Sequence, residues 1–99
     1  MPENRDIVIT RKYDKAGEKF RSVMVSQVSG DNIEGTVFRF EVWAIDQELK
    51  DKRVDSGNKY TVRKIFIETL MDMQEDGWKR MGSSTSAHPE EKFFDPQYL

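Results

Sequence analysis

The stretch TVRKIFIETLMDMQEDGW, residues 61–78, decides the fold because it predicts one amphipathic helix with a defined end. We expect Thr61 to be the N-cap, because its hydroxyl can accept a hydrogen bond from a free amide of the first turn. The helix should end near Asp76, since Gly77 can take the left-handed conformation that closes many helices. One stripe of side chains recurs at helical spacing and suits packing against a sheet: Val62, Ile65, Phe66, Thr69, Leu70 and Met73.

Trp78 follows the glycine directly, and its position admits two interpretations. In a Schellman motif the residue after the glycine packs back on the last turn of the helix, which would make Trp78 part of the core. An exposed tryptophan that binds a ligand or partner is the alternative. We favour the core interpretation, because the Gly-Trp pair lies where the helix must end.

Upstream of the helix, GTVFRFEVWAI at residues 35–45 is the strongest strand pattern in the chain. One face is predicted to hold Phe38, Phe40, Val42 and Ala44, and the other Val37, Arg39, Glu41, Trp43 and Ile45. Two earlier strands are predicted at residues 5–13 and 19–28, with Ile7, Ile9 and Tyr13 on one face of the first. The polar DKAGEK between them predicts a hairpin turn.

Residues 46–60 are polar and predict a connection to the helix, while residues 78–82 predict a short strand after it. The sequence therefore predicts an α+β fold: a small antiparallel sheet in the order β-β-β-α-β, covered on one face by one helix, with room for a fifth strand at the C-terminus. We expect one domain over residues 1–99, with a flexible loop at 82–91 and an aromatic tail at 92–99.

The composition suits a soluble cytoplasmic protein. Of the 99 residues, 34% are charged and the net charge is −2, so no overall field draws the chain to nucleic acid or an anionic membrane. The chain has no cysteine, which excludes disulfides and thiolate metal sites and suits a reducing compartment. The N-terminus lacks a signal-peptide pattern, and no apolar run approaches the roughly 20 residues of a membrane span.

No motif for catalysis or for a cofactor stands out. His88 is the only histidine, and with Glu90, Glu91 and Asp95 it offers too few nitrogen ligands for zinc, so we interpret it as a solvated loop residue. The sequence contains neither a P-loop nor a dinucleotide fingerprint. We therefore expect a protein that is not an enzyme and that has no metal site and no cofactor.

Apolar side chains beyond the main stripe indicate where a partner could dock. Ile67 and Met71 fall off the centre of the helical stripe, so either the loop and tail of the same chain cover them or another chain does. The tail adds Phe93, Phe94 and Tyr98. These five residues predict a non-catalytic interaction or regulatory protein that docks on a protein partner or on a second copy of itself. The strand, helix, Gly-Trp and strand order is loosely similar to small bacterial domains, and a bacterial or phage protein fits it.

A basic stretch between residues 50 and 64 supports a second function, weak nucleic-acid binding. The residues that would contact phosphates are Lys50, Lys52, Arg53, Lys59 and Arg63. Phe38 and Phe40 would then stack on bases, whereas the simpler interpretation places them in the core beneath the helix. Salt separates the two functions, because phosphate binding weakens steeply as salt rises and apolar docking does not.

Overall fold

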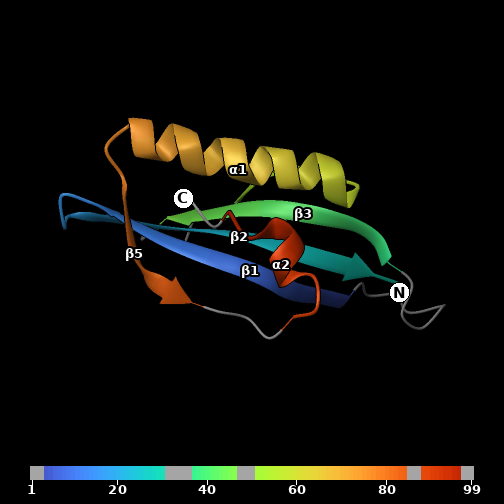
Figure 1. The fold of residues 1–99 in the computed structure, drawn as a ribbon. Coiled ribbons are helices and arrows are strands. Elements are labelled where there is room, and N and C mark those ends of the chain that lie inside the picture. The colour runs from blue at the N-terminus through green and yellow to red at the C-terminus, as the bar shows by residue number, and fades with distance from the viewer. Residues whose placement is uncertain (1–3, 31–36, 47–50, 85–87, 97–99) are drawn as a thin grey trace.

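The computed structural model describes residues 4–30, 37–46, 51–84 and 88–96, and in these residues five strands form one antiparallel sheet (Figure 1). The strand order is β4-β3-β2-β1-β5. The predicted α+β class, a small antiparallel sheet with one main helix packed on it, is confirmed. The elements are β1 (Asn4–Lys15), β2 (Lys19–Ser29), β3 (Val37–Asp46), β4 (Asp51–Gly57), α1 (Lys59–Glu75), β5 (Lys79–Ser84) and the short α2 (Glu91–Phe94).

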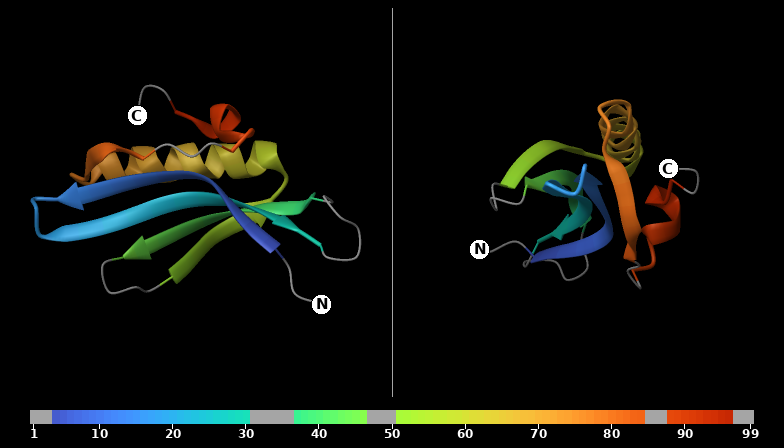
Figure 2. Two further views of the ribbon diagram at one scale, coloured as in Figure 1. Left: turned by 90° about the horizontal axis from the view of Figure 1, so that it is seen from below. Right: turned by 90° about the vertical axis from the view of Figure 1, so that its left-hand side faces the viewer.

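Both helices lie on the same side of the sheet, as the two views of Figure 2 show. The long helix α1 contacts β2, β3 and β4, and α2 contacts β1 and α1. The chain enters α1 from the edge strand β4 and leaves it toward β5 at the opposite edge. The connection through α1 therefore joins the two opposite edge strands of the sheet.

The core lies between the sheet and the helices. Alternate residues of the three central strands point into it, and α1 contributes the buried part of the predicted stripe. Thr69 of that stripe is only partly buried, and its hydroxyl donates to the Ile65 carbonyl oxygen at 2.7 Å. The buried members of the core are Val8, Ile9, Tyr13, Val23, Val25, Phe40, Val42, Val62, Phe66, Leu70, Met73, Trp78 and Phe94.

The C-terminal end of α1 is a Schellman motif built on Gly77, whose φ is +93°. The Trp78 amide donates to the Met73 carbonyl oxygen at 3.0 Å, and the Gly77 amide donates to that of Gln74 at 3.1 Å. Trp78 is 7% exposed and belongs to the core. The interpretation of Trp78 as a core residue at the helix end is therefore confirmed.

The N-terminal end of α1 differs from the prediction. Asn58 is the N-cap, because its side-chain oxygen accepts from the Thr61 amide at 2.9 Å. Thr61 lies inside the helix, which begins at Lys59. The assignment of Thr61 as N-cap was wrong because the serine, glycine and asparagine before it resemble an ordinary turn, and an asparagine caps as well as a threonine does.

The hairpin between β1 and β2 turns through two left-handed residues, Ala16 with φ +54° and Gly17 with φ +71°. The Glu18 amide donates to the Lys15 carbonyl oxygen at 3.0 Å, and the Asp14 carboxylate accepts from the Gly17 amide at 3.0 Å. Two positive φ values at the centre define the turn type that matches the twist of a two-residue hairpin. The predicted hairpin turn at DKAGEK is confirmed.

Two further segments depart from the prediction. Residues 51–57 form β4, which pairs with β3, where the sequence predicted only a polar connection. β4 is an edge strand, and edge strands are commonly charged, so the apolar alternation that marks a strand is missing there. Residues 91–94 form the helical turn α2 and not a further strand. Residues 82–84 belong to β5, so both ends of the segment predicted as a loop at 82–91 lie in regular elements.

Candidate functional site

A groove of about 490 Å³ lies on the side of the sheet opposite the helices. It is lined by Arg5, Ile7, Met24, Ser26, Trp43 and Ile45, which we call the open-face groove. No helix or strand of the described residues covers this side. A sheet face turned to water is normally polar, whereas four of the six side chains here are apolar. The groove is therefore a candidate binding site.

A β-bulge brings Ile7 to this groove. The pairing of β1 with β2 shifts between Ile7 and Ile9, so Val8 and Ile9 both enter the core while Ile7 faces the other side. Ile7 is 53% exposed, and the prediction that it shares a face with Ile9 was wrong for this reason. A bulge adds one residue to one strand and reverses the alternation beyond it. No local sequence signal marked this bulge.

The pairing of β2 with β3 places further groove residues on the same face of the sheet. Met24 pairs with Trp43, and Ser26 pairs with Glu41, so these four side chains share one face of the sheet. Ile7 pairs with Ser26 on the other side of β2. The apolar side chains therefore come from three adjacent strands.

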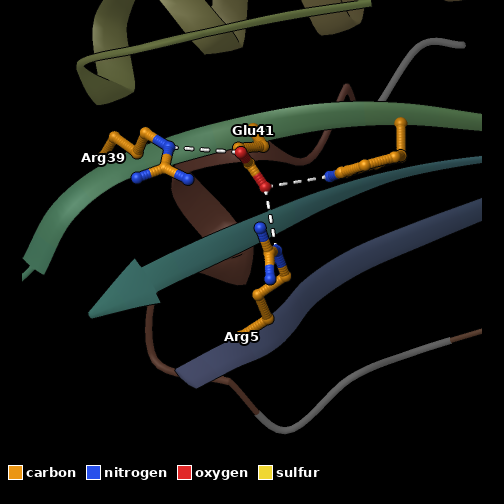
Figure 3. Close-up of polar contacts among 4 residues, drawn as sticks. Arg5, Arg39 and Glu41 are labelled. Atoms are coloured by element: carbon orange, nitrogen blue, oxygen red, sulfur yellow. Dashed lines mark hydrogen bonds and ion pairs between the residues drawn. The ribbon is translucent and has the colours of Figure 1, made fainter. Parts of the chain in front are cut away.

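Glu41 forms the polar centre of this face. Its side chain is fully buried, and its carboxylate accepts from Arg5 Nε at 3.2 Å, from Arg39 Nε at 3.1 Å and from Trp43 Nε1 at 3.1 Å. Figure 3 shows the two guanidinium groups reaching the carboxylate from different strands. We call Arg5, Arg39, Glu41 and Trp43 the Glu41 cluster.

The surroundings of the Glu41 carboxylate favour its ionised form. Burial alone raises the pKa of Glu41, but the hydrogen bonds from Arg5, Trp43 and Arg39 together outweigh it and hold the pKa below its ordinary value. Glu41 is therefore ionised at neutral pH and covered from solvent, an arrangement suited to holding its neighbours and not to donating a proton. The guanidinium-bearing side chains of Arg5 and Arg39 remain 47% and 28% exposed.

The residues predicted for docking do not form one surface in the structure. Met71 is 44% exposed on α1, whereas Ile67 is 9% exposed. Phe94 is fully buried and packs on Phe40, with ring centroids 5.4 Å apart. Phe93 is partly buried and packs edge-on against Phe94 at 5.1 Å, and Tyr98 lies outside the described residues.

Charged side chains also hold residues 91–95, the tail segment, to the rest of the chain. Arg11, whose side chain is 3% exposed, donates to Asp95 at 2.8 Å. Arg63 Nε donates to the Phe93 carbonyl oxygen at 2.9 Å, and the Lys59 ammonium lies 4.8 Å from the Phe93 ring centroid. Of the two arrangements left open by the sequence, cover within the chain is therefore the one observed for residues 91–95.

The residues predicted to bind nucleic acid are divided among several elements. Lys59 and Arg63 contact the tail segment, Lys52 and Arg53 belong to β4, and Lys50 lies outside the described residues. Phe40 is 7% exposed beneath Phe94, so its interpretation as a core residue is confirmed. The backbone of Phe38 lies in β3.

A second hollow of about 320 Å³ lies beside the end of α1, and four of the five charged side chains that line it form ion pairs. Lys15 contacts Asp76 at 3.1 Å, and the hydrogen bond and charge of Lys15 hold the pKa of Asp76 below its ordinary value. Arg21 contacts Asp46 at 2.7 Å, and its guanidinium lies 4.6 Å from the centre of the Trp78 ring. These contacts fasten the β1–β2 hairpin to the helix end, which is a structural role.

A third hollow of about 440 Å³ contains His88, with Lys59, Pro89 and Glu90 among its lining residues. The His88 Nδ1 accepts from the Glu90 amide at 3.0 Å, which orders the turn before α2. Within residues 4–30, 37–46, 51–84 and 88–96, no three histidine, aspartate or glutamate side chains gather where they could hold a metal ion.

The predicted strand face that holds Trp43 and Ile45 forms part of the open-face groove, but the sequence predicted no role for it. One face of the strongest strand was predicted to hold Arg39, Glu41, Trp43 and Ile45. The sequence signal for the site was an acid that lies between an arginine and a tryptophan on that face. Arg5 joins Glu41 from another strand, 36 residues away in sequence, so no local pattern could have paired them.

No family model matches this chain, and neither a curated protein nor a solved structure matches it. Neither helix of the described part of the chain is long and apolar enough to cross a membrane.

Proposed function

We propose that this chain is a non-catalytic interaction or regulatory protein of the cytoplasm that docks on a protein partner through the open-face groove. The observation that carries the proposal is the apolar lining of a sheet face that no described element covers. Ile7 is 53% exposed there, and it lies in one hollow with Met24, Trp43 and Ile45. A single exposed apolar residue is ordinary, but a contiguous apolar hollow bordered by charge is typical of interaction sites.

The groove supports docking better than the five residues predicted from sequence. Phe94 and Ile67 are already buried within the chain, so their side chains offer a partner little surface. Met71 stays exposed on the other side of the molecule and could add to a second contact. The arginines beside the groove add a polar border, and aromatic and arginine side chains are the residues that most often anchor interfaces.

The experiment compares the native chain with two variants of equal surface charge. Ile7→Lys adds a charge inside the groove, and Tyr60→Lys adds the same charge at a site that is 69% exposed on α1. Each purified chain is used to capture proteins from the native host, followed by mass spectrometry. Docking through the groove predicts a protein that the native chain and Tyr60→Lys retain and Ile7→Lys loses. Equal capture by all three chains would contradict the proposal.

Weak nucleic-acid binding is the second candidate, and it has less support. Lys59 and Arg63 would have to bind phosphates while they also contact Phe93. A gel shift with mixed-sequence DNA and RNA at low salt tests it, using a Lys50, Lys52 and Arg53 to alanine variant as the control. A shift in the native chain that the variant abolishes would raise this function above protein docking.

A further inference from the structure

Ser26 carries a hydroxyl without a partner in the chain at the floor of the open-face groove. Ser26 lines the groove and is 4% exposed, whereas Ile7, which pairs with it, is 53% exposed at the rim. In the part of the chain that the structure describes, the Ser26 hydroxyl makes no hydrogen bond. Glu41 pairs with Ser26 in the sheet, but its carboxylate accepts from Trp43 and from two arginines (Figure 3). Buried hydroxyls are normally hydrogen-bonded, so Ser26 offers a bond that a ligand can complete.

The groove has its neutral polar group at the floor and apolar side chains above it. The apolar lining consists of Ile7, Met24, Trp43 and Ile45, all of them more exposed than Ser26. A matching occupant therefore has a polar tip and an apolar body behind that tip. A leucine or phenylalanine would leave the hydroxyl unpaired, and a charged side chain would lose its hydration against the apolar lining. A tyrosine fits, because its hydroxyl lies at the far end of an apolar ring that packs well on a tryptophan.

We propose, building on the docking function above, that the partner inserts a tyrosine side chain into the open-face groove. The ring lies between Ile7, Met24 and Trp43, and its hydroxyl forms a hydrogen bond with Ser26 Oγ. Both hydroxyl groups are neutral, so the contact depends on shape and hydrogen bonding and not on charge. Tyrosine is also among the side chains that most often anchor protein interfaces.

A second copy of the chain is a poorer occupant than a different protein. Of the tyrosines that the structure describes, Tyr13 is fully buried and Tyr60 is 69% exposed. The Tyr60 ring packs edge-on against Phe93, with centroids 5.4 Å apart, and insertion elsewhere would cost this contact. Tyr60 also lies on α1, on the side of the sheet opposite the groove. Its insertion into another copy would be a head-to-tail contact, which builds rings or open chains and not a two-fold dimer.

Three acetylated and amidated peptides test the hydroxyl contact by NMR titration of the full chain. GSLYGSG carries the tyrosine, GSLFGSG lacks only its hydroxyl, and GSLAGSG lacks the ring. The Trp43 indole and Ile7 methyl signals report on the groove. We expect GSLYGSG to shift both signals at millimolar concentration and to bind about fivefold more tightly than GSLFGSG, the ratio that one net hydrogen bond provides. GSLAGSG should leave both signals in place.

Ser26→Ala tests the groove side of the same contact, with Ser22→Ala as its matched control. Both serines lie on one face of β2, four residues apart, and Ser22 is not among the residues that line the groove. Ser26→Ala should keep or raise the midpoint of urea denaturation, because it removes no hydrogen bond from the described part of the chain. It should bind GSLYGSG and GSLFGSG equally, whereas Ser22→Ala should keep the preference for tyrosine.

The outcomes separate this inference from the docking function. Equal binding of GSLYGSG and GSLFGSG by the native chain, or an unchanged preference in Ser26→Ala, would refute the hydroxyl contact and leave docking through the groove intact. A lower urea midpoint for Ser26→Ala would mean that the hydroxyl serves the fold, which also refutes it. Absence of any shift by GSLYGSG at about 5 mM would refute the insertion of a tyrosine.

Size-exclusion chromatography of the native chain and of Tyr60→Lys tests the second copy as occupant. The proposal predicts that neither chain changes its apparent mass with protein concentration. A mass that rises with concentration in the native chain and stays that of a monomer in Tyr60→Lys would assign the groove to a second copy. The docking function is judged separately by the Ile7→Lys capture experiment.

Discussion

Replacing Glu41 by glutamine should destabilise the fold by about 2–3 kcal/mol at neutral pH. One carboxylate oxygen accepts from Arg5 and Trp43, and the other accepts from Arg39. The glutamine oxygen can keep the first two bonds, but its amide would turn a donor toward the donor of Arg39. One charge-assisted bond worth about 1.5–3 kcal/mol is then lost, and the two others weaken. Relief of the buried charge offsets part of this loss.

The lowered pKa of Glu41 predicts how the stability difference between the native chain and Glu41→Gln changes with pH. The pKa of Glu41 in the fold is below its ordinary value of 4.5. The stabilisation is therefore fully present above that value and is lost as pH falls through the lower folded pKa. The difference in unfolding free energy between the native chain and Glu41→Gln should shrink from pH 7 to about pH 3. Urea denaturation at the two pH values measures it.

Asp46→Asn is the matched control. Asp46 contacts Arg21 at 2.7 Å, a shorter distance than any in the Glu41 cluster, but both side chains are partly exposed. Exposed ion pairs contribute at most about 1 kcal/mol, so this variant should be close to the native chain in stability. If Glu41→Gln is as stable as the native chain at pH 7, or if its deficit does not change with pH, the cluster is not the stabilising centre inferred here.

Three further predictions concern stability. Trp78→Ala should cost about 3–5 kcal/mol in urea denaturation, because it empties a core position, and a variant that melts like the native chain would contradict the core role. Ala16→Asn should add about 0.5–1 kcal/mol to the unfolding free energy, because asparagine tolerates the left-handed conformation before Gly17 better than alanine; a loss of stability would refute this account of the turn. Truncation after Pro89 should lower the melting temperature at every protein concentration without changing the oligomeric state, because it removes the buried Phe94. Loss of a dimer with unchanged intrinsic stability would mean that the tail acts between chains.

Those features of the fold that depend on neighbouring residues could be predicted. The stripe on α1, the left-handed Gly77 and the burial of Trp78 all follow from spacing within one helix and its cap. The hairpin turn at Ala16 and Gly17 follows from its polar sequence in the same way. These signals are local, so one sequence is enough to show them.

The features that were missed depend on residues far apart in the chain. β4 becomes a strand because β3 offers it a pairing edge, and not because of its own composition. The exposure of Ile7 follows from a bulge that only the pairing of two strands defines. Glu41 becomes a buried acid because Arg5 reaches it across the sheet. The candidate site therefore lies where sequence patterns carry the least information.

The position of β5 beside β1 has a consequence for synthesis on the ribosome. Thr10 pairs with Ser84, and Arg11 contacts Asp95, so the outer edge of β1 receives its neighbours only after residues 79–95 have been synthesised. The four-stranded meander β1–β4 joins strands adjacent in sequence and can assemble earlier. Until α1 carries the chain across the sheet, the β1 edge is open to pairing with other nascent chains. We therefore expect slow translation of residues 79–95, or premature termination before Lys79, to lower the soluble yield far more than a delay within the meander.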